Sequence, residues 1–164
     1  MSFFDSPNQR VSRKKRFGLC DDAPPPHKPA FLDEADGKKW IAVVHNDYSY
    51  DVLFVALDNS IALRRPDGKP DRCSDGLLSC NSTVIFVELT TRKDKDWKKD
   101  KEEQLRITIR HFENTEEAHG YEIKKAYIAN SSYPKDNTRN MIRMNNFFKD
   151  TKYVLRIENR IVVE

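Results

Sequence analysis

Short apolar runs separated by polar breaks dominate the first half of the chain. Between residues 40 and 90 these runs are rich in β-branched side chains, which is typical of strands joined by tight turns. The expected strands are 40–45, 51–57, 60–65, 73–79 and 83–89. Asp58 and Asn59 fit a two-residue hairpin turn between the second and third strands. The last strand is nearly continuous in apolar residues, which predicts a central strand covered on both faces.

A helical period appears after residue 96. The segment 97–112 lacks Gly and Pro, and it places Leu105, Ile109 and Phe112 at positions i, i+4 and i+7. This spacing predicts an amphipathic helix. Trp97, which opens it, is interpreted as a core anchor, with base stacking as the alternative role.

The remainder of the chain alternates between the two patterns. A strand is expected at 121–129, a second helix at 137–149, and a closing hairpin of strands 153–157 and 160–163. The second helix carries an apolar group that is interpreted as core, or alternatively as a protein-binding groove: Met141, Met144, Phe147 and Phe148. This order predicts an α/β fold, a mixed β-sheet flanked by helices.

The first 30 residues differ from the rest. Five of the eight prolines lie between residues 7 and 29. Because proline lacks an amide donor and fixes φ, long regular structure is not expected here. We therefore predict a basic, proline-containing N-terminal arm over residues 1–30, a short turn or helix near residue 31, and a single domain over residues 31–164.

Several classes of protein do not fit this sequence. No apolar run approaches the length of a membrane span, and no secretory signal pattern opens the chain, so a cytoplasmic protein without a membrane partner is expected. Cys20, Cys73 and Cys80 lack the spacing of a disulfide framework or a zinc cluster. The four histidines are scattered and show no zinc-binding spacing.

The charge distribution is more informative than the net charge of +3. The run from Arg10 to Arg16 contains no acid, whereas the run from Arg92 to Arg106 is dense in both signs. Either run fits a solvated surface or a contact with a nucleic-acid backbone. The basic residues expected at such a contact are Arg13, Lys14, Lys15, Arg16, Arg92, Lys93 and Lys95.

Two acidic residues stand out from the charged surface. Asp75 is followed directly by apolar residues, and Glu88 follows the four apolar residues 84–87. A carboxylate at the end of a buried strand is costly unless it is paired, hydrogen-bonded or bound to a metal. On neighbouring strands, Asp75 and Glu88 are able to converge on one Mg²⁺ ion. The structural alternative is that backbone amides or basic neighbours satisfy both.

These residues resemble the core of the PD-(D/E)XK nuclease superfamily. The resemblance rests on Asp75-Gly-Leu-Leu, on 83–90 with Glu88 near its end, and on a helix that contains Gln104. It covers roughly residues 31–130 and implies a restriction-endonuclease-like α-β-β-β-α-β core. It also implies Asp75 and Glu88 as Mg²⁺ ligands, Gln104 near the site and Glu34 as a further acid from a first helix.

The sequence departs from the family pattern at one position. Where the family places a lysine two residues after the glutamate, this chain has Thr90, which supplies no positive charge to a developing anion. Arg92, Lys93 or Lys95 are candidates to replace it from the following loop. Two hypotheses follow: a Mg²⁺-dependent nuclease with an altered site, or a non-catalytic interaction protein, such as an immunity or accessory factor, with a protein partner.

Overall fold

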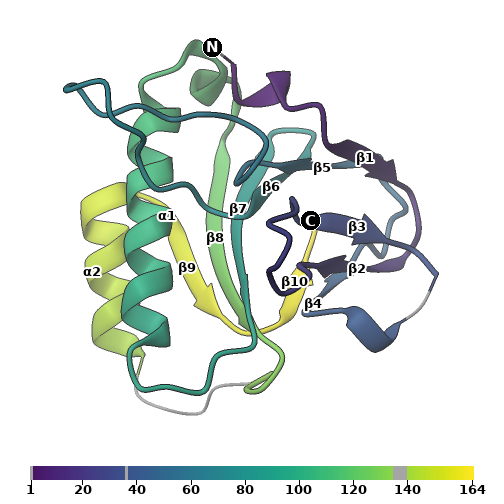
Figure 1. Cartoon of the computed structure of the whole chain (residues 1–164). Coiled ribbons are helices and arrows are strands. Elements are labelled where there is room, and N and C mark those ends of the chain that lie inside the picture. The colour runs from purple at the N-terminus through teal and green to yellow at the C-terminus, as the bar shows by residue number, and fades with distance from the viewer. Residues whose placement is uncertain (1, 36, 135–139) are drawn as a thin grey trace.

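The computed structural model describes residues 2–35, 37–134 and 140–164, which form two β-sheets and a layer of two α-helices (Figure 1). The α/β fold class predicted from the sequence is confirmed. The larger sheet has six strands in the order β1-β5-β6-β7-β8-β9. Their bounds are β1 Gln9–Ser12, β5 Val52–Ala56, β6 Gly76–Cys80, β7 Thr83–Thr90, β8 Ile123–Asn130 and β9 Val154–Ile157.

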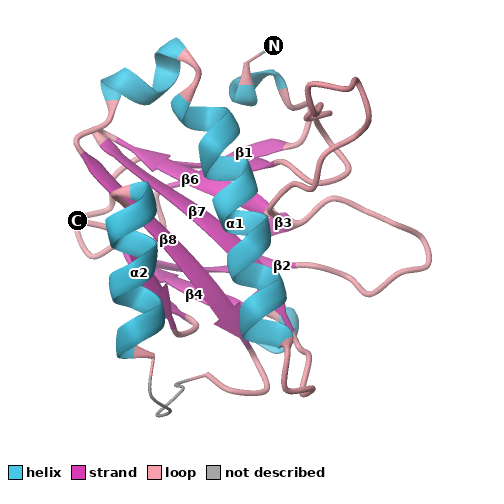
Figure 2. Cartoon of the chain, turned by 90° about the vertical axis from the view of Figure 1, so that its left-hand side faces the viewer, coloured by secondary structure: helices cyan, strands magenta, loops and turns pink. Residues whose placement is uncertain are grey.

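Strand direction divides the larger sheet into two halves. Strands β1, β5, β6 and β7 pair antiparallel, whereas β7, β8 and β9 pair parallel. Parallel neighbours need crossover connections. Helix α1 (Trp97–Glu113) links β7 to β8, and α2 (Met141–Thr151) links β8 to β9. Both helices cover the same face of the sheet (Figure 2).

The second sheet covers the opposite face. It has four strands in the order β10-β4-β2-β3, with bounds β2 Arg16–Cys20, β3 Phe31–Asp33, β4 Ala42–His45 and β10 Arg160–Val162. Three 3-10 helices complete the described structure: η1 Phe3–Asp5, η2 Gly37–Lys39 and η3 Glu116–Gly120. None of the described helices is long and apolar enough to span a membrane.

Strand β7 lies between two cores, as its apolar composition predicts. All eight of its residues are buried. Phe86 belongs to the core beneath the helices, together with Leu105 of α1, while Ile85 belongs to the core between the sheets. Because side chains alternate along a strand, even-numbered residues of β7 face the helices. Glu88 therefore points toward the helix layer.

Two of the predicted hairpins are wrong. Residues 60–65 form no strand: the amides of Ser60 and Ile61 bond back to the Leu57 carbonyl, so the chain turns into a loop. The closing hairpin is replaced by β9 in the larger sheet and β10 in the smaller one. The reason is burial, since Leu155 packs in the helix-side core and Ile161 in the core between the sheets.

The N-terminal segment is part of both sheets. Residues 1–30, interpreted as an arm, supply β1 to the larger sheet and β2 to the smaller one. The turn or helix expected near residue 31 is strand β3. Phe17 and Leu19 are fully buried between the sheets, which explains why this polar segment is held in place. The prolines lie in the loop between β2 and β3 and near η1.

The second helix also differs from its prediction. It begins at Met141, and residues 137–139 of the predicted helix lie outside the described residues. Of its four apolar residues, Phe147 is fully buried and Met144 packs partly against the core. Met141 is 68% exposed and Phe148 48% exposed, so the prediction that they are core residues is wrong.

Gly76 in β6 allows the neighbouring strand β5 to approach closely. A Cβ atom there would lie 2.8 Å from the Val55 carbonyl oxygen and would also overlap the Phe54 ring. Backbone atoms of a sheet cannot move away cheaply, so we expect Gly76→Ala to lower the free energy of unfolding by about 1–3 kcal/mol. Urea denaturation measures this, with Gly120→Ala as the control because a Cβ at Gly120 meets nothing within 4 Å. Equal stability of the two variants would contradict the prediction.

Candidate active site

The register of β6 and β7 brings the two singled-out carboxylates together. Gly76 pairs with Val87 in this antiparallel ladder, so one step further along the register sets Asp75 opposite Glu88. Asp75 is 8% exposed and Glu88 is completely buried. Both lie on the helix-facing side of the sheet. The predicted convergence of Asp75 and Glu88 thus follows from strand pairing.

Asp75 has a fixed position at the start of β6. Its Oδ2 atom accepts a hydrogen bond of 2.7 Å from the backbone amide of Leu89, the residue after Glu88. Its own carbonyl oxygen accepts from the amide of Leu57. These bonds hold the Asp75 carboxylate against the end of β7. They also satisfy part of its hydrogen-bonding capacity, as the structural alternative anticipates.

Glu88 is in a different situation. Neither of its carboxylate oxygens has a hydrogen-bond partner among the described residues. The ammonium group of Lys101 lies 3.5 Å from Oε2. Burial, and then the nearby Asp75 carboxylate, raise the pKa of Glu88 well above its usual range, while Lys101 opposes this effect. A fully buried carboxylate without hydrogen bonds is costly, and such groups often mark functional sites.

Lys101 supplies the positive charge of the site. It lies in the second turn of α1, and its side chain is only 17% exposed. Burial alone would lower the pKa of Lys101, but Glu88 and Asp75 outweigh burial and raise it. The ammonium therefore stays charged between the two carboxylates and the solvent.

Lys101 is not among the cations that the sequence indicates for this site, because those candidates, Arg92, Lys93 and Lys95, lie in the loop after β7. In that loop the Arg92 guanidinium is bound by Asp94 at 2.6 Å and by Asp100 at 2.9 Å, and Lys93 and Lys95 are exposed. The spacing of residues along α1 does indicate that Lys101 faces the sheet. Residue 101 lies four positions before the buried Leu105, which places both on one face of α1.

Asp75 and Lys101 border a small polar pocket of about 160 Å³, and the fully buried Glu88 lies behind them rather than on its lining. We call this space the acidic pocket. Asp75, Lys101 and Gln104 line it on the sheet and helix side, so Gln104 lies in the same pocket as Asp75. Its other walls come from the loop between β2 and β3 and from the turn after β5, with lining residues Asp21, Asp22, Pro24, His27, Lys28, Ala30, Asp58 and Asn59.

Asp21 and Asp58 were not singled out in the sequence. Burial and the Asp75 carboxylate raise the pKa of Asp21 to about 7, and the same two causes raise the pKa of Asp58. The sequence feature that marks Glu88, an acid that follows a run of apolar residues, also marks Asp21 and Asp58. Asp21 directly follows the buried strand β2, and Asp58 follows the buried β5 and Leu57.

Two predicted site residues lie elsewhere. The Thr90 side chain is one pleat beyond Glu88, but its hydroxyl accepts the Arg92 amide at 3.1 Å and it does not line the pocket. Glu34 is bound by Arg10 at 2.6 Å and by Ser12 at 2.8 Å. It follows β3, at the end of that strand away from Asp21, so Glu34 is not an acid of this site.

The N-terminal basic run is also distant from the acidic pocket. Arg13 pairs with Asp51, and the Arg16 guanidinium lies over the Trp40 ring. This run ends at Arg16, the first residue of β2, whereas Asp21 follows the strand, so the length of β2 separates them by about 17 Å at roughly 3.4 Å per residue. Lys14 and Lys15 are exposed beside the same end of β2.

The donor set limits which metal the site would hold. Within residues 2–35, 37–134 and 140–164, no group of three or more His, Cys, Asp or Glu side chains is arranged to hold a metal. Mg²⁺ is commonly bound by only one or two carboxylates, with water and substrate phosphates completing its shell. The carboxylate oxygens of Glu88, which accept no hydrogen bond among the described residues and lie beside Asp75, fit that mode of binding.

Comparison of this chain with family models, with curated proteins and with solved structures gave no match.

The raised pKa of Asp21 predicts a pH-dependent stability. Between its ordinary value of 3.8 and about 7, the folded state keeps this proton while the unfolded chain releases it. Stability therefore falls as pH rises through this window and is level above it. We expect Asp21→Asn to raise the free energy of unfolding by about 1–2 kcal/mol at pH 8, and to have little effect at pH 3.5, after allowance for solvent screening of a half-buried group.

Urea denaturation at the two pH values measures this difference. Asp47→Asn is the matched control, because Asp47 is exposed in the loop after β4. An equal effect of Asp21→Asn at both pH values would contradict the coupling of Asp21 to the acidic pocket.

Proposed function

We propose that this chain is a Mg²⁺-dependent phosphodiesterase that acts on nucleic acid, built like a PD-(D/E)XK nuclease with Lys101 in the role of the family's lysine. The observation that carries the proposal is the position of Lys101. It brings an ammonium group from α1 to 3.5 Å from Glu88, beside Asp75. The combination of two carboxylates and one lysine is therefore complete even though residue 90 is threonine.

The topology around the site supports the proposal. Strands β5, β6 and β7 form an antiparallel meander, and α1 then leads to β8, which is parallel to β7. This order matches the β-β-β-α-β portion of the core that the resemblance implies, with Asp75 at the second strand and Glu88 on the third. The first helix of that core has no counterpart in the described residues before β5, where η1 and η2 are three residues each.

The residues present fit a divalent cation bound through Asp75 and Glu88. A bound Mg²⁺ would polarise a phosphoryl oxygen of the substrate and lower the pKa of a water molecule bound to it. In this chain Lys101 would stabilise the charge that develops on the phosphate, and its charged state is favoured by Glu88 and Asp75. The Asp75 carboxylate is held by the Leu89 amide, so its orientation is set before any substrate binds.

The test is cleavage of labelled single-stranded and duplex DNA and RNA by the purified chain. We expect products with Mg²⁺ or Mn²⁺ and none with excess chelator. Absence of cleavage of all four substrates with both metals would contradict the proposal.

A second function is favoured by one surface. Met141, Ile142 and Phe148 of α2 are exposed at 68%, 77% and 48%, which is unusual for large apolar side chains on a helix. This surface fits the alternative of a non-catalytic protein that binds another protein. The two functions differ in the role of Lys101, because an interaction protein would use the Lys101–Glu88 pair only for stability.

A further inference from the structure

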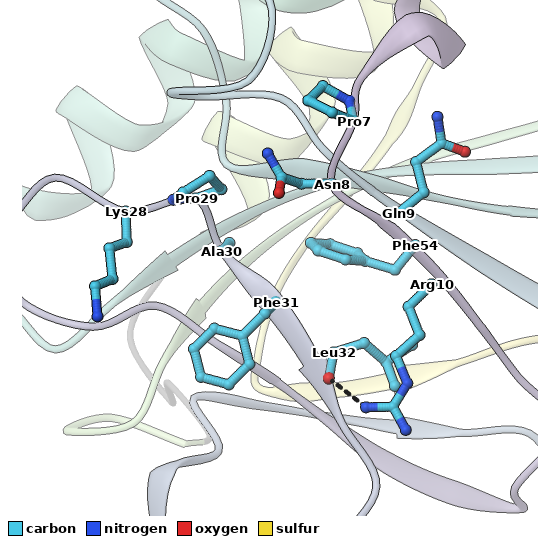
Figure 3. Close-up of a pocket in the computed structure, with 10 residues that line it drawn as sticks. All are labelled: Pro7, Asn8, Gln9, Arg10, Lys28, Pro29, Ala30, Phe31, Leu32 and Phe54. Atoms are coloured by element: carbon cyan, nitrogen blue, oxygen red, sulfur yellow. Dashed lines mark hydrogen bonds between the residues drawn. The ribbon is translucent and has the colours of Figure 1, made fainter.

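A second pocket adjoins the acidic pocket and is larger and more apolar. It has a volume of about 470 Å³ and lies between residues 7–10, residues 28–32 and the Phe54 ring. We call it the edge pocket, because β1 and β3 are the outer strands of their two sheets. Figure 3 shows residues 7–10 and 28–32 running along two sides of the pocket, with Phe54 between them. Arg10 closes one end by donating to the Leu32 carbonyl.

The edge pocket and the acidic pocket share one wall. Lys28 and Ala30 line both of them, so the short segment 28–30 separates the apolar space from the carboxylates. Lys28 is exposed on this wall. With a divalent cation held by Asp75 and Glu88, as the proposed function requires, a molecule that fills both pockets needs a flat apolar part and, next to it, an anionic part that contacts the cation and Lys101.

We propose that the edge pocket binds the base of an unpaired nucleotide whose phosphate lies in the acidic pocket, so the substrate of this site is single-stranded nucleic acid. This inference rests on the proposed function. The volume accommodates a base with part of its sugar, and the partly exposed ring of Phe31 supplies a surface for stacking, whereas Phe54 is only 2% exposed and contributes apolar lining. Stacking on aromatic side chains binds unpaired bases with little sequence preference.

The surroundings of the acidic pocket argue against a duplex. Its volume is only about 160 Å³, and the loop between β2 and β3 forms one wall. Figure 2 shows this loop projecting outward beside α1. A base inside a duplex is paired and stacked, so it cannot enter the edge pocket unless it is first unpaired.

Phe31 is the residue with which to test the inference. It is 38% exposed at the rim, so its replacement leaves the buried core intact. Binding of a short fluorescent oligothymidylate is measured by anisotropy with Ca²⁺ in place of Mg²⁺. We expect Phe31→Ala to weaken binding about tenfold or more. Phe31→Trp should retain binding, with the new tryptophan quenched by the stacked base.

Two matched controls identify what is bound. Phe148→Ala removes an exposed phenylalanine of α2, far along the chain from the pocket, and is expected to bind like the wild type. An abasic oligomer of equal length carries the same phosphates without bases, and is expected to bind about tenfold more weakly to the wild type. The oligothymidylate annealed to its complement is expected to bind more weakly as well.

Equal binding by Phe31→Ala and the wild type, equal binding of the abasic oligomer, or no binding of oligothymidylate would overturn the inference. The proposed function is tested separately by cleavage. Binding that depends on Phe31 without any cleavage would support the edge pocket and refute the nuclease. Cleavage that is indifferent to Phe31 would leave the nuclease standing and refute the edge pocket.

Discussion

Lys101→Met is expected to lower Mg²⁺-dependent cleavage by roughly 10²–10³-fold while the fold is retained. The physical reason is that Lys101 carries the only positive charge within 4 Å of Glu88 among the described ion pairs. Methionine keeps most of the side-chain volume and removes the charge. Product formation from a labelled oligonucleotide measures the effect.

The matched control is Lys99→Met. Lys99 lies two residues away on α1 but is exposed, so its replacement is expected to leave cleavage unchanged. A double variant, Lys101→Met with Thr90→Lys, tests the role more sharply. Residues 88 and 90 lie on the same face of β7, so a lysine at 90 is expected to restore part of the activity. Full activity of Lys101→Met would contradict the assignment.

The same variant has a consequence for stability. Lys101 opposes the rise in the pKa of Glu88, so its removal makes ionisation of Glu88 more costly. Because a raised folded pKa reduces stability as pH increases, the loss of stability in Lys101→Met is expected to be larger at pH 8 than at pH 5. Activity assays are therefore compared well below the unfolding temperature of both variants.

Glu88→Gln is expected to abolish both metal binding and cleavage without loss of stability at pH 8. Glutamine removes a charge that is completely buried and has no hydrogen-bond partner among the described residues. Lys101 keeps Asp75 as a nearby counter-charge. Thermal unfolding with and without Mn²⁺ measures both effects, because a ligand that binds only the folded state raises the unfolding temperature.

This outcome separates a functional site from a structural ion pair. If the Glu88–Lys101 pair served only stability, Glu88→Gln would lower the free energy of unfolding by about 3–5 kcal/mol, the usual cost of breaking a buried pair. Unchanged or increased stability with loss of metal binding is the signature of a charge retained for function.

Local patterns in the sequence predicted the elements around the site. The continuous apolar run of β7 and the helical period of α1 each reflect burial on known faces, and both elements lie close to their predicted bounds. The convergence of Asp75 and Glu88 was predictable because adjacent strands in a hairpin have a fixed register. The positions of β7, α1 and the Asp75–Glu88 pair are set by residues that are close together in the sequence.

Features that depend on distant pairing were not predictable in the same way. Nothing local to residues 154–162 shows that β9 and β10 belong to different sheets, because both have similar apolar alternation. Lys101 reaches Glu88 only because α1 packs across β7, and Asp21 and Asp58 reach the pocket only because β2 and β5 end beside it. The acidic pocket is thus assembled from four separate parts of the chain.

The most direct test of the central claim is a calorimetric titration of the wild-type chain with Mn²⁺, beside Glu88→Gln and Glu103→Gln. Glu103 lies on α1 but is exposed, so its variant controls for the loss of one negative charge. A metal site built on Asp75 and Glu88 predicts saturable binding of Mn²⁺ to the wild type and to Glu103→Gln, and none to Glu88→Gln. Equal Mn²⁺ binding by Glu88→Gln and the wild type would contradict a metal site built on Asp75 and Glu88.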